Sequence, residues 1–201
     1  MRYPTLQNDS ITAGILAGGQ GRRMGGIDKG WADFEGKPLI AHVLERLQPQ
    51  THSILISANR NLDAYRALGY PVLKDRIDGF QGPLAGLASL LQACPTEWLA
   101  TVPCDAPGLP NDYLVRMASA AEQTPGTRIV VAHNGDRLQP VHMLVARNLL
   151  DDLLSHLQQG GRKVRGWLGQ YAYQTADFSD QPQAFFNLNH EADLRQPIRT
   201  N

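Results

Sequence analysis

One stretch of the chain combines glycine with cationic side chains in a way that suits phosphate chemistry. Residues 16–29, Leu-Ala-Gly-Gly-Gln-Gly-Arg-Arg-Met-Gly-Gly-Ile-Asp-Lys, contain five glycines, two arginines and one lysine. Glycine lets backbone N–H groups approach an anion closely, and Arg22, Arg23 and Lys29 can neutralise its charge. We therefore interpret the stretch as a polyphosphate-binding loop. A glycine-rich surface loop with scattered charges is the alternative.

Two common phosphate-binding motifs do not match this loop. The dinucleotide motif G-x-G-x-x-G fails because Met24 stands where the third glycine belongs. The ATPase motif G-x-x-x-x-G-K-[ST] fails because Ile27 and Asp28 follow Gly26. The pattern that remains is L-A-G-G-x-x-x-R-M-G-G-x-D-K.

A carboxylate after a second apolar run is the next candidate for chemistry. Asp105 follows residues 98–103 and lies within Pro-Cys-Asp-Ala-Pro. A single carboxylate can hold Mg²⁺ together with substrate phosphates, although a carboxylate that caps a turn is the alternative. Ser57 and Asp75 follow two further apolar runs, where they are either ligand contacts or turn formers.

A second group of polar residues lies in the C-terminal half of the chain. Arg162 and Lys163 follow two glycines, and Asn187 and Asn189 alternate with leucine. Basic side chains at a glycine turn suit a phosphate, and asparagine side chains suit the polar edges of a heterocycle. These residues predict a second substrate site. Asn189 could instead cap a helix that begins before Glu191.

The elements that position these residues alternate along the first half of the chain. Apolar runs predict strands at 11–16, 53–57, 71–75 and 98–103, separated by helices at 38–48, at 61–68 and from Pro83 onward. This alternation predicts a parallel sheet with helices on both faces. Because ligands bind at the carboxyl ends of such strands, the loop and the polar residues that follow the strands should meet at one edge.

The second half of the chain changes character. We expect helices at 111–122, 148–157 and 161–170, strands at 128–133, 138–145, 171–176 and 184–188, and a helical turn at 191–195. The turn Asn134-Gly135-Asp136 lies between two of these strands and indicates a hairpin. The sheet should therefore be mixed, with an antiparallel addition to a mainly parallel α/β core.

Length and composition limit the class of protein. The 201 residues suit one domain, with 42% hydrophobic and 19% charged residues. The 19 basic and 19 acidic residues balance, which argues against a general nucleic-acid binder. We find no signal-peptide or membrane-span pattern, and Cys94 and Cys104 form no disulfide framework, so we expect a cytoplasmic protein.

The loop pattern and the Pro-x-Asp-x-Pro context of Asp105 resemble the molybdenum cofactor guanylyltransferase family. The resemblance implies a three-layer, Rossmann-like nucleotidyltransferase fold in a single domain, residues 1–201. Residues 10–107 would bind GTP and Mg²⁺, and residues 108–195 would bind molybdopterin. The implied reaction joins GMP from GTP to the terminal phosphate of the molybdenum–molybdopterin cofactor and releases pyrophosphate.

The resemblance also implies roles for individual residues. Lys29, Arg23 and Asp105 would be catalytic, with Asp105 holding the metal. The nucleotide would contact Leu16, Ala17, Gly18, Gly19, Lys29, Ser57, Asp75 and Asp105. The acceptor would contact Arg162, Lys163, Asn187 and Asn189. Relatives carry asparagine in place of Ser57 and arginine in place of Lys163.

Three other functions remain open from the sequence. A cytidylyltransferase acting on the same cofactor would depart from Leu-Ala-Gly-Gly. A sugar-phosphate nucleotidyltransferase fits poorly with the short chain and the asparagine pair at 187 and 189. A non-catalytic cofactor carrier would not need both Lys29 and Asp105. The resemblance further implies molybdenum-insertion proteins and molybdoenzyme-specific chaperones as partners, and we expect a monomer that binds neither nucleic acid nor membrane.

Overall fold

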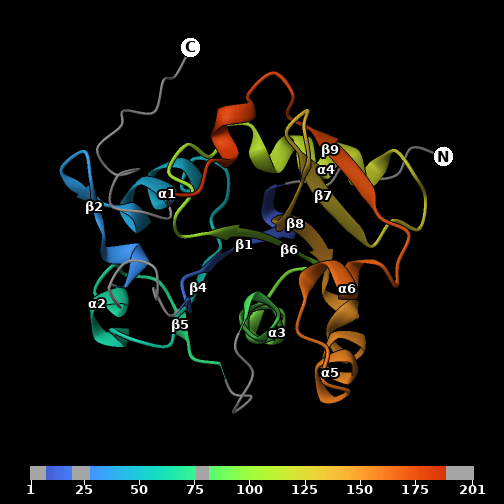
Figure 1. Ribbon diagram of the computed structural model, residues 1–201, viewed down its shortest axis with the longest axis horizontal. Coiled ribbons are helices and arrows are strands. Elements are labelled where there is room, and N and C mark those ends of the chain that lie inside the picture. Colours follow the sequence, from blue (N-terminus) through green and yellow to red (C-terminus); the bar gives the residue numbers. More distant parts are fainter. Residues whose placement is uncertain (1–7, 20–27, 76–81, 189–201) are drawn as a thin grey trace.

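A seven-stranded sheet forms the centre of the computed structural model, which describes residues 8–19, 28–75 and 82–188 (Figure 1). The strand order is β5-β4-β1-β6-β8-β7-β9, and β2 and β3 form a separate hairpin. The strands are β1 (Ile11–Leu16), β2 (Asp33–Phe34), β3 (Lys37–Pro38), β4 (Ile54–Ser57), β5 (Val72–Leu73), β6 (Trp98–Pro103), β7 (Ile129–His133), β8 (Leu138–Ala146) and β9 (Gln174–Asp177).

Helices cover both faces of this sheet. The α-helices are α1 (Leu39–Leu47), α2 (Leu62–Arg66), α3 (Pro83–Ala93), α4 (Tyr113–Glu122), α5 (Leu150–Gln158) and α6 (Val164–Leu168). Short 3₁₀ helices are η1 (Asn8–Ser10), η3 (Lys29–Trp31), η4 (Arg147–Leu149) and η5 (Pro182–Phe185). Figure 1 shows α1 and α4 on one side of the sheet and α3 and α5 on the other. This is the three-layer α/β arrangement that the alternation of elements predicts.

Two hydrophobic cores follow from the two-residue period of the strands. Ile11, Ala13 and Ile15 of β1 point into the core that α1, α2 and α4 cover. On the other face, side chains of α3, α5 and α6 pack together with Leu99 and Val145. Strands buried on both faces are typical of parallel sheets whose crossover helices lie on both sides.

The parallel part of the sheet brings the ends of β4, β1 and β6 to one edge. Leu16, the last residue of β1, pairs with Ser57 of β4 and with Pro103 of β6. β8 then runs antiparallel to both β6 and β7, as the hairpin signal predicts. The mixed sheet is therefore confirmed.

A bulge interrupts β8 near this same edge. Met143 pairs with Val131 and Gln139 pairs with Ala132, so three residues of β8 have no partner on β7. The bulge places His142 in the core, where its ring meets Phe185 edge-on with centroids 4.9 Å apart. Bulges re-aim side chains in this way and are common at sheet edges and beside active sites.

One predicted strand is wrong. Residues 184–188 do not pair with the sheet, because Pro182 opens η5 and the chain then continues as coil to Leu188. The apolar side chains of this segment are buried in two different places: Phe185 packs in the core beneath α4, whereas Leu188 joins a small cluster with Phe34 and Leu39. The predicted helical turn at 191–195 lies outside the described residues.

Two further findings bear on the sequence-based expectations. Among residues 8–19, 28–75 and 82–188, no helix has the length and apolarity that crossing a bilayer requires. Cys94 and Cys104 are both buried and both reduced.

Candidate active site

Lys29 and Asp105 meet at the carboxyl edge of the sheet. Lys29 Nζ lies 2.8 Å from Asp105 Oδ2, and the two side chains are 19% and 9% exposed. They can meet because Asp105 follows β6, the strand that pairs with β1. The Cys104 N–H donates to the Leu16 carbonyl at 3.1 Å, which carries the pairing one residue beyond β6. The parallel register of two adjacent strands thus brings together a lysine and an aspartate that are distant in sequence.

A buried carboxylate holds the backbone on which Lys29 sits. Asp28 is 7% exposed and accepts hydrogen bonds from Tyr65 Oη at 2.7 Å, Asn61 Nδ2 at 3.0 Å and Gly30 N at 3.2 Å. Tyr65 and Asn61 belong to α2 and its N-cap, so the exit of the loop is tied to that helix. Buried carboxylates need such donors, because burial of an unpaired charge costs free energy.

A second polar cluster lies next to the end of β1. Asp75 Oδ2 accepts from Asn59 Nδ2 at 2.8 Å, and Asp75 Oδ1 accepts from Ser57 Oγ at 3.2 Å. The Asp75 N–H donates in return to Asn59 Oδ1 at 3.1 Å. Gly18 lies against this cluster, since a Cβ at Gly18 would be 2.9 Å from Asn59 Nδ2. The backbone after β1 therefore passes directly over a fixed set of donors and acceptors.

The start of α3 completes this side of the site. A Cβ on Gly86 would lie 2.7 Å from Leu16 Cδ2 and 2.9 Å from Ser57 Oγ, so only glycine fits there. Gly82, the N-cap of α3, has a φ of 149°, which few residues other than glycine adopt. The backbone carbonyl of Arg162 lies 3.6 Å from the position that a Cβ on Gly82 would take. The second basic stretch is therefore next to the beginning of α3.

The segment after η5 reaches the same edge from the other side. The Leu188 N–H donates to the carbonyl of Asp105 at 3.0 Å. Asn187 therefore immediately precedes the residue whose backbone binds Asp105. Lys163 is exposed and serves as the N-cap of α6. The structure thus places the Arg162 carbonyl next to the start of α3, and Asn187 next to the residue that contacts the Asp105 backbone.

The neighbouring thiol takes no part in this polar arrangement. Burial raises the pKa of the Cys104 thiol well above its usual value, and the negative charge of Asp105 raises it further. A thiol in such surroundings stays protonated and is a poor nucleophile. Cys104 therefore packs in the core, as the sequence suggests.

The structure places most of the residues that the sequence predicts for the donor half of the site. Leu16, Gly18, Ser57 and Asp75 lie together, as shown above, and Lys29 meets Asp105. Ala17 is buried, and its N–H donates to the Ser57 carbonyl; the Gly19 carbonyl accepts from Arg60 Nη2 at 3.2 Å. Arg22, Arg23 and Asn189 lie outside the described residues.

Sequence reasoning gave no role to several residues that build the site. Asp28 belongs to the loop pattern, but its partners Asn61 and Tyr65 carry no local signal. Asn59 follows a strand like many turn formers, and only the fold reveals its pairing with Asp75. The one sequence signal that could have indicated Asn61 is its residue type, since asparagine tolerates the left-handed conformation that it adopts, with φ 49°.

The donor set at Asp105 fits a hard cation that is held mainly by substrate phosphates. No cluster of three or more His, Cys, Asp or Glu side chains occurs within the described ranges, so a cage made of protein ligands alone is not present there. Lys29 contacts Oδ2 of Asp105, so one oxygen of this carboxylate is engaged by a cation of the protein itself. One carboxylate combined with phosphates is the usual way in which Mg²⁺ is bound.

Comparisons with known proteins agree with this arrangement. Residues 13–175 match the MobA-like NTP transferase domain family. The chain is 46% identical to the molybdenum cofactor guanylyltransferase of Shewanella putrefaciens, over 89% of this chain and 91% of the relative. It is also 46% identical to the enzyme of the same name from Vibrio campbellii, over 95% of this chain and 96% of the relative.

A solved structure shares the fold. Molybdopterin-guanine dinucleotide biosynthesis protein A from Archaeoglobus fulgidus superposes with a TM-score of 0.75, covering 92% of this chain and 95% of that protein at 22% identity. This structural likeness, at 22% identity, shows the fold alone. The family match and the sequence identity to relatives over most of their length assign the family. The chain belongs to the MobA-like NTP transferases and, within them, to the molybdenum cofactor guanylyltransferase family.

Proposed function

We propose that this protein transfers GMP from GTP to the terminal phosphate of the molybdenum–molybdopterin cofactor and releases pyrophosphate. The observation that carries the proposal is the meeting of Lys29 with Asp105 at the strand ends, beside the Asp75 cluster. A cation and a carboxylate at this edge suit a nucleoside triphosphate. The name of the relatives supports guanine as the base and the molybdenum cofactor as the acceptor.

The donor half of the site lies between Lys29 and Asp75. The Lys29 ammonium is a compact charge that can neutralise the phosphates of GTP. Asp75, Asn59 and Ser57 offer a fixed set of polar atoms to the nucleoside. The missing side chains of Gly18 and Gly86 let the backbone pack closely against Asn59, Leu16 and Ser57, which holds these polar groups in place. As part of the same proposal, Gly19 is assigned to the nucleoside and Arg23 to the phosphates.

The transfer needs no general base and no covalent intermediate. The terminal phosphate of the acceptor is already an anion, and one of its oxygens attacks the α-phosphorus of GTP. The bond from the α-phosphorus to the oxygen that bridges it to the β-phosphorus breaks, and pyrophosphate leaves with the electron pair. Catalysis then depends on positioning and on stabilisation of charge.

Asp105 would hold Mg²⁺, which when bound would neutralise charge on the α-phosphate and on the leaving pyrophosphate. Lys29, in contact with the same carboxylate, fixes the orientation of that side chain. On the acceptor side, we assign Arg162 and Lys163 to the phosphate and Asn187 and Asn189 to the pterin. A divalent metal, these acceptor contacts, a monomeric state, a cytoplasmic location and the cofactor-handling partners all remain predictions.

The test is to incubate the protein with Mg²⁺, molybdenum-loaded molybdopterin and each of the four nucleoside triphosphates in turn, and to follow pyrophosphate. We expect release with GTP alone and formation of the guanine dinucleotide. Release with CTP would indicate the cytidylyltransferase alternative. Release with a sugar phosphate in place of molybdopterin would indicate the second alternative, and no release with any acceptor would indicate a carrier.

A further inference from the structure

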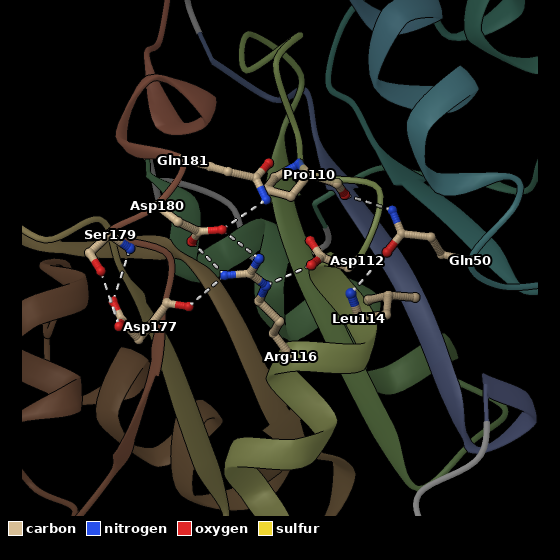
Figure 2. A network of polar contacts seen from close by, with 9 residues as sticks. All are labelled: Gln50, Pro110, Asp112, Leu114, Arg116, Asp177, Ser179, Asp180 and Gln181. Carbon is tan, nitrogen blue, oxygen red and sulfur yellow. Dashed lines mark hydrogen bonds and ion pairs between the residues drawn. The ribbon is translucent and has the colours of Figure 1, made fainter. Parts of the chain in front are cut away.

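One arginine joins two parts of the chain that both lead to Asp105. They are the stretch that follows Asp105 and the 177–188 segment, whose last residue donates to the Asp105 carbonyl. Figure 2 shows Arg116, in the first turn of α4, pointing toward the segment that follows β9. Its Nε donates to Asp112 Oδ2 at 2.7 Å. Its two terminal nitrogens donate to the two carboxylate oxygens of Asp180, at 2.6 and 2.7 Å. This paired geometry fixes both distance and orientation, which a single contact cannot do.

Two further contacts extend the hold of Arg116 on the same segment. Arg116 Nη1 also donates to the backbone carbonyl of Asp177 at 3.2 Å. The guanidinium lies over the ring of Phe178, 5.2 Å from its centroid. Three residues of this turn are therefore organised around one side chain that is 29% exposed. The network is larger than an isolated surface ion pair, which contributes little to stability.

The turn that Arg116 holds, residues 177–180, leads along the chain to the proposed acceptor site. Phe178 packs against Phe185, with ring centroids 5.1 Å apart, and Phe185 packs against His142 of the β8 bulge. Gly108 lies against the backbone of Ala184, since a Cβ there would be 3.4 Å from Ala184 Cα. Three residues after Phe185, the Leu188 N–H reaches the Asp105 carbonyl.

The helix that carries Arg116 is fixed at its own beginning. Gln50 Nε2 donates to the carbonyl of Pro110 at 2.9 Å, and Gln50 Oε1 accepts from the Leu114 N–H at 2.9 Å (Figure 2). Gln50 is 5% exposed and follows α1. α4 is thus a fixed support, and Arg116 ties the 177–188 segment to it without any strand pairing after β9.

We propose that Arg116 is a positioning residue for the acceptor: through Asp180 and Asp177 it holds the 177–188 segment so that Asn187 stays beside Asp105. The inference rests on the proposed function, because it concerns the acceptor half of that site. It predicts that loss of the clamp affects acceptor binding much more than GTP binding, since Lys29 and the Asp75 cluster lie on other segments.

The variants are Arg116→Gln, Arg116→Lys and Asp180→Asn. We expect each to raise the KM for molybdopterin about 10-fold or more, with the KM for GTP changed less than about twofold. Arg116→Lys should not rescue binding, because an ammonium cannot bridge both oxygens of Asp180. The double variant Arg116→Gln/Asp180→Asn should be no worse than Arg116→Gln, because both changes remove one shared contact.

Arg128→Gln is the matched control. Arg128 also lies over an aromatic ring, that of Tyr171 at 5.5 Å, and approaches one carboxylate, Asp152, at 3.9 Å. It holds no part of the 177–188 segment among its described contacts, so its loss should leave both KM values unchanged. An equal rise of both KM values in the Arg116 variants, or no rise for molybdopterin, overturns the inference.

Hydrogen exchange separates this inference from the proposed function. In the full-length protein without substrates, Arg116→Gln should speed amide exchange in residues 178–188 and leave β1 and α3 unchanged. Unchanged exchange in residues 178–188 overturns the inference even if the protein transfers GMP normally. If the wild-type protein transfers no GMP, the proposed function fails, and faster exchange in the variant still shows that Arg116 orders the segment.

Discussion

Lys29 Nζ lies 2.8 Å from Asp105 Oδ2, across a separation of 76 residues in the chain. Asp105 directly follows β6, and Lys29 lies further along the chain after β1; the two strands are neighbours in the sheet. The pair marks the point where a triphosphate and its metal would meet. Its chemistry can be tested one residue at a time.

Replacement of Asp105 by asparagine should reduce turnover by about 10²-fold or more, because the amide cannot supply the charge that a metal requires. Pyrophosphate release with saturating GTP and molybdopterin measures the loss. Asp63→Asn is the control, since Asp63 contacts only the exposed Arg66 one helical turn away. Normal turnover by Asp105→Asn would remove Asp105 from the metal site.

Replacement of Lys29 by methionine should weaken GTP binding by about 10-fold or more, since a buried charge contact with phosphate is lost. The dissociation constant for GTP, measured by calorimetry, gives the size of the effect. Lys37→Met is the matched control, because Lys37 forms an exposed ion pair with Glu45 away from the site. An unchanged dissociation constant for Lys29→Met would contradict the assignment.

Gly19→Ala separates ligand contact from folding. No described atom lies within 4 Å of the position that a Cβ on Gly19 would occupy, so the free protein should keep its stability. If the backbone of Gly19 lies against the nucleotide, the added methyl group should weaken GTP binding by about 10-fold. Thermal unfolding and GTP titration together make the test; equal affinity in both proteins would place the nucleotide elsewhere.

Asp28→Ala should lower the free energy of unfolding by about 2 kcal/mol, because three donors, two of them in buried hydrogen bonds, lose their acceptor. It should also lower kcat/KM for GTP, since Lys29 loses its anchor. Asp33→Asn is the control, because Asp33 accepts only from Gly36 N, at 3.3 Å on an exposed turn. Urea unfolding and steady-state kinetics test the two parts separately. A destabilised variant with normal kinetics would show that Asp28 supports the fold but not Lys29.

His142 should make stability depend on pH. Burial lowers the pKa of this histidine from 6.5 to about 3, so the folded protein holds it neutral. The unfolded chain takes up a proton below pH 6.5, so the contribution of His142 is fully present above that pH and is lost as pH falls toward 3. The loss amounts to up to about 5 kcal/mol over that window.

The measurement is the free energy of unfolding in urea between about pH 4 and about pH 7, for the wild type and His142→Phe, which keeps the ring shape. The variant should show a shallower dependence on pH. His52→Asn, at an exposed position, should follow the wild type. Identical pH profiles for the wild type and His142→Phe would show that His142 is not held neutral.

Much of the fold follows from patterns that are local in the sequence. β1 and β6 begin and end where their apolar runs do, and α3 begins at Pro83 because proline suits the first position of a helix. The residues Lys29 and Asp105 could be predicted because each follows such an element. The parallel arrangement then placed them at one edge.

The parts that could not be predicted depend on contacts between distant segments. Tyr65 carries no local signal in the sequence, and only the position of α2 brings its hydroxyl to Asp28. The apolar residues at 184–188 suggest a strand, yet Phe185 and Leu188 enter separate clusters, so no sheet partner is required. The hydrophobic pattern of a sequence predicts that a side chain is buried, but it does not predict in which cluster that side chain packs.

The hydrogen bond from Leu188 N–H to the Asp105 carbonyl links the binding of the two substrates. It joins the backbone of Asp105, the proposed metal ligand, to the segment assigned to the acceptor. A substrate that tightens one of these segments must favour the tight form of the other, and thermodynamic linkage makes the effect mutual and equal in size. Because a single backbone hydrogen bond carries this link, GTP and molybdopterin should bind with only weak cooperativity, about twofold or less in apparent affinity, in agreement with the small change in the KM for GTP expected for the Arg116 variants.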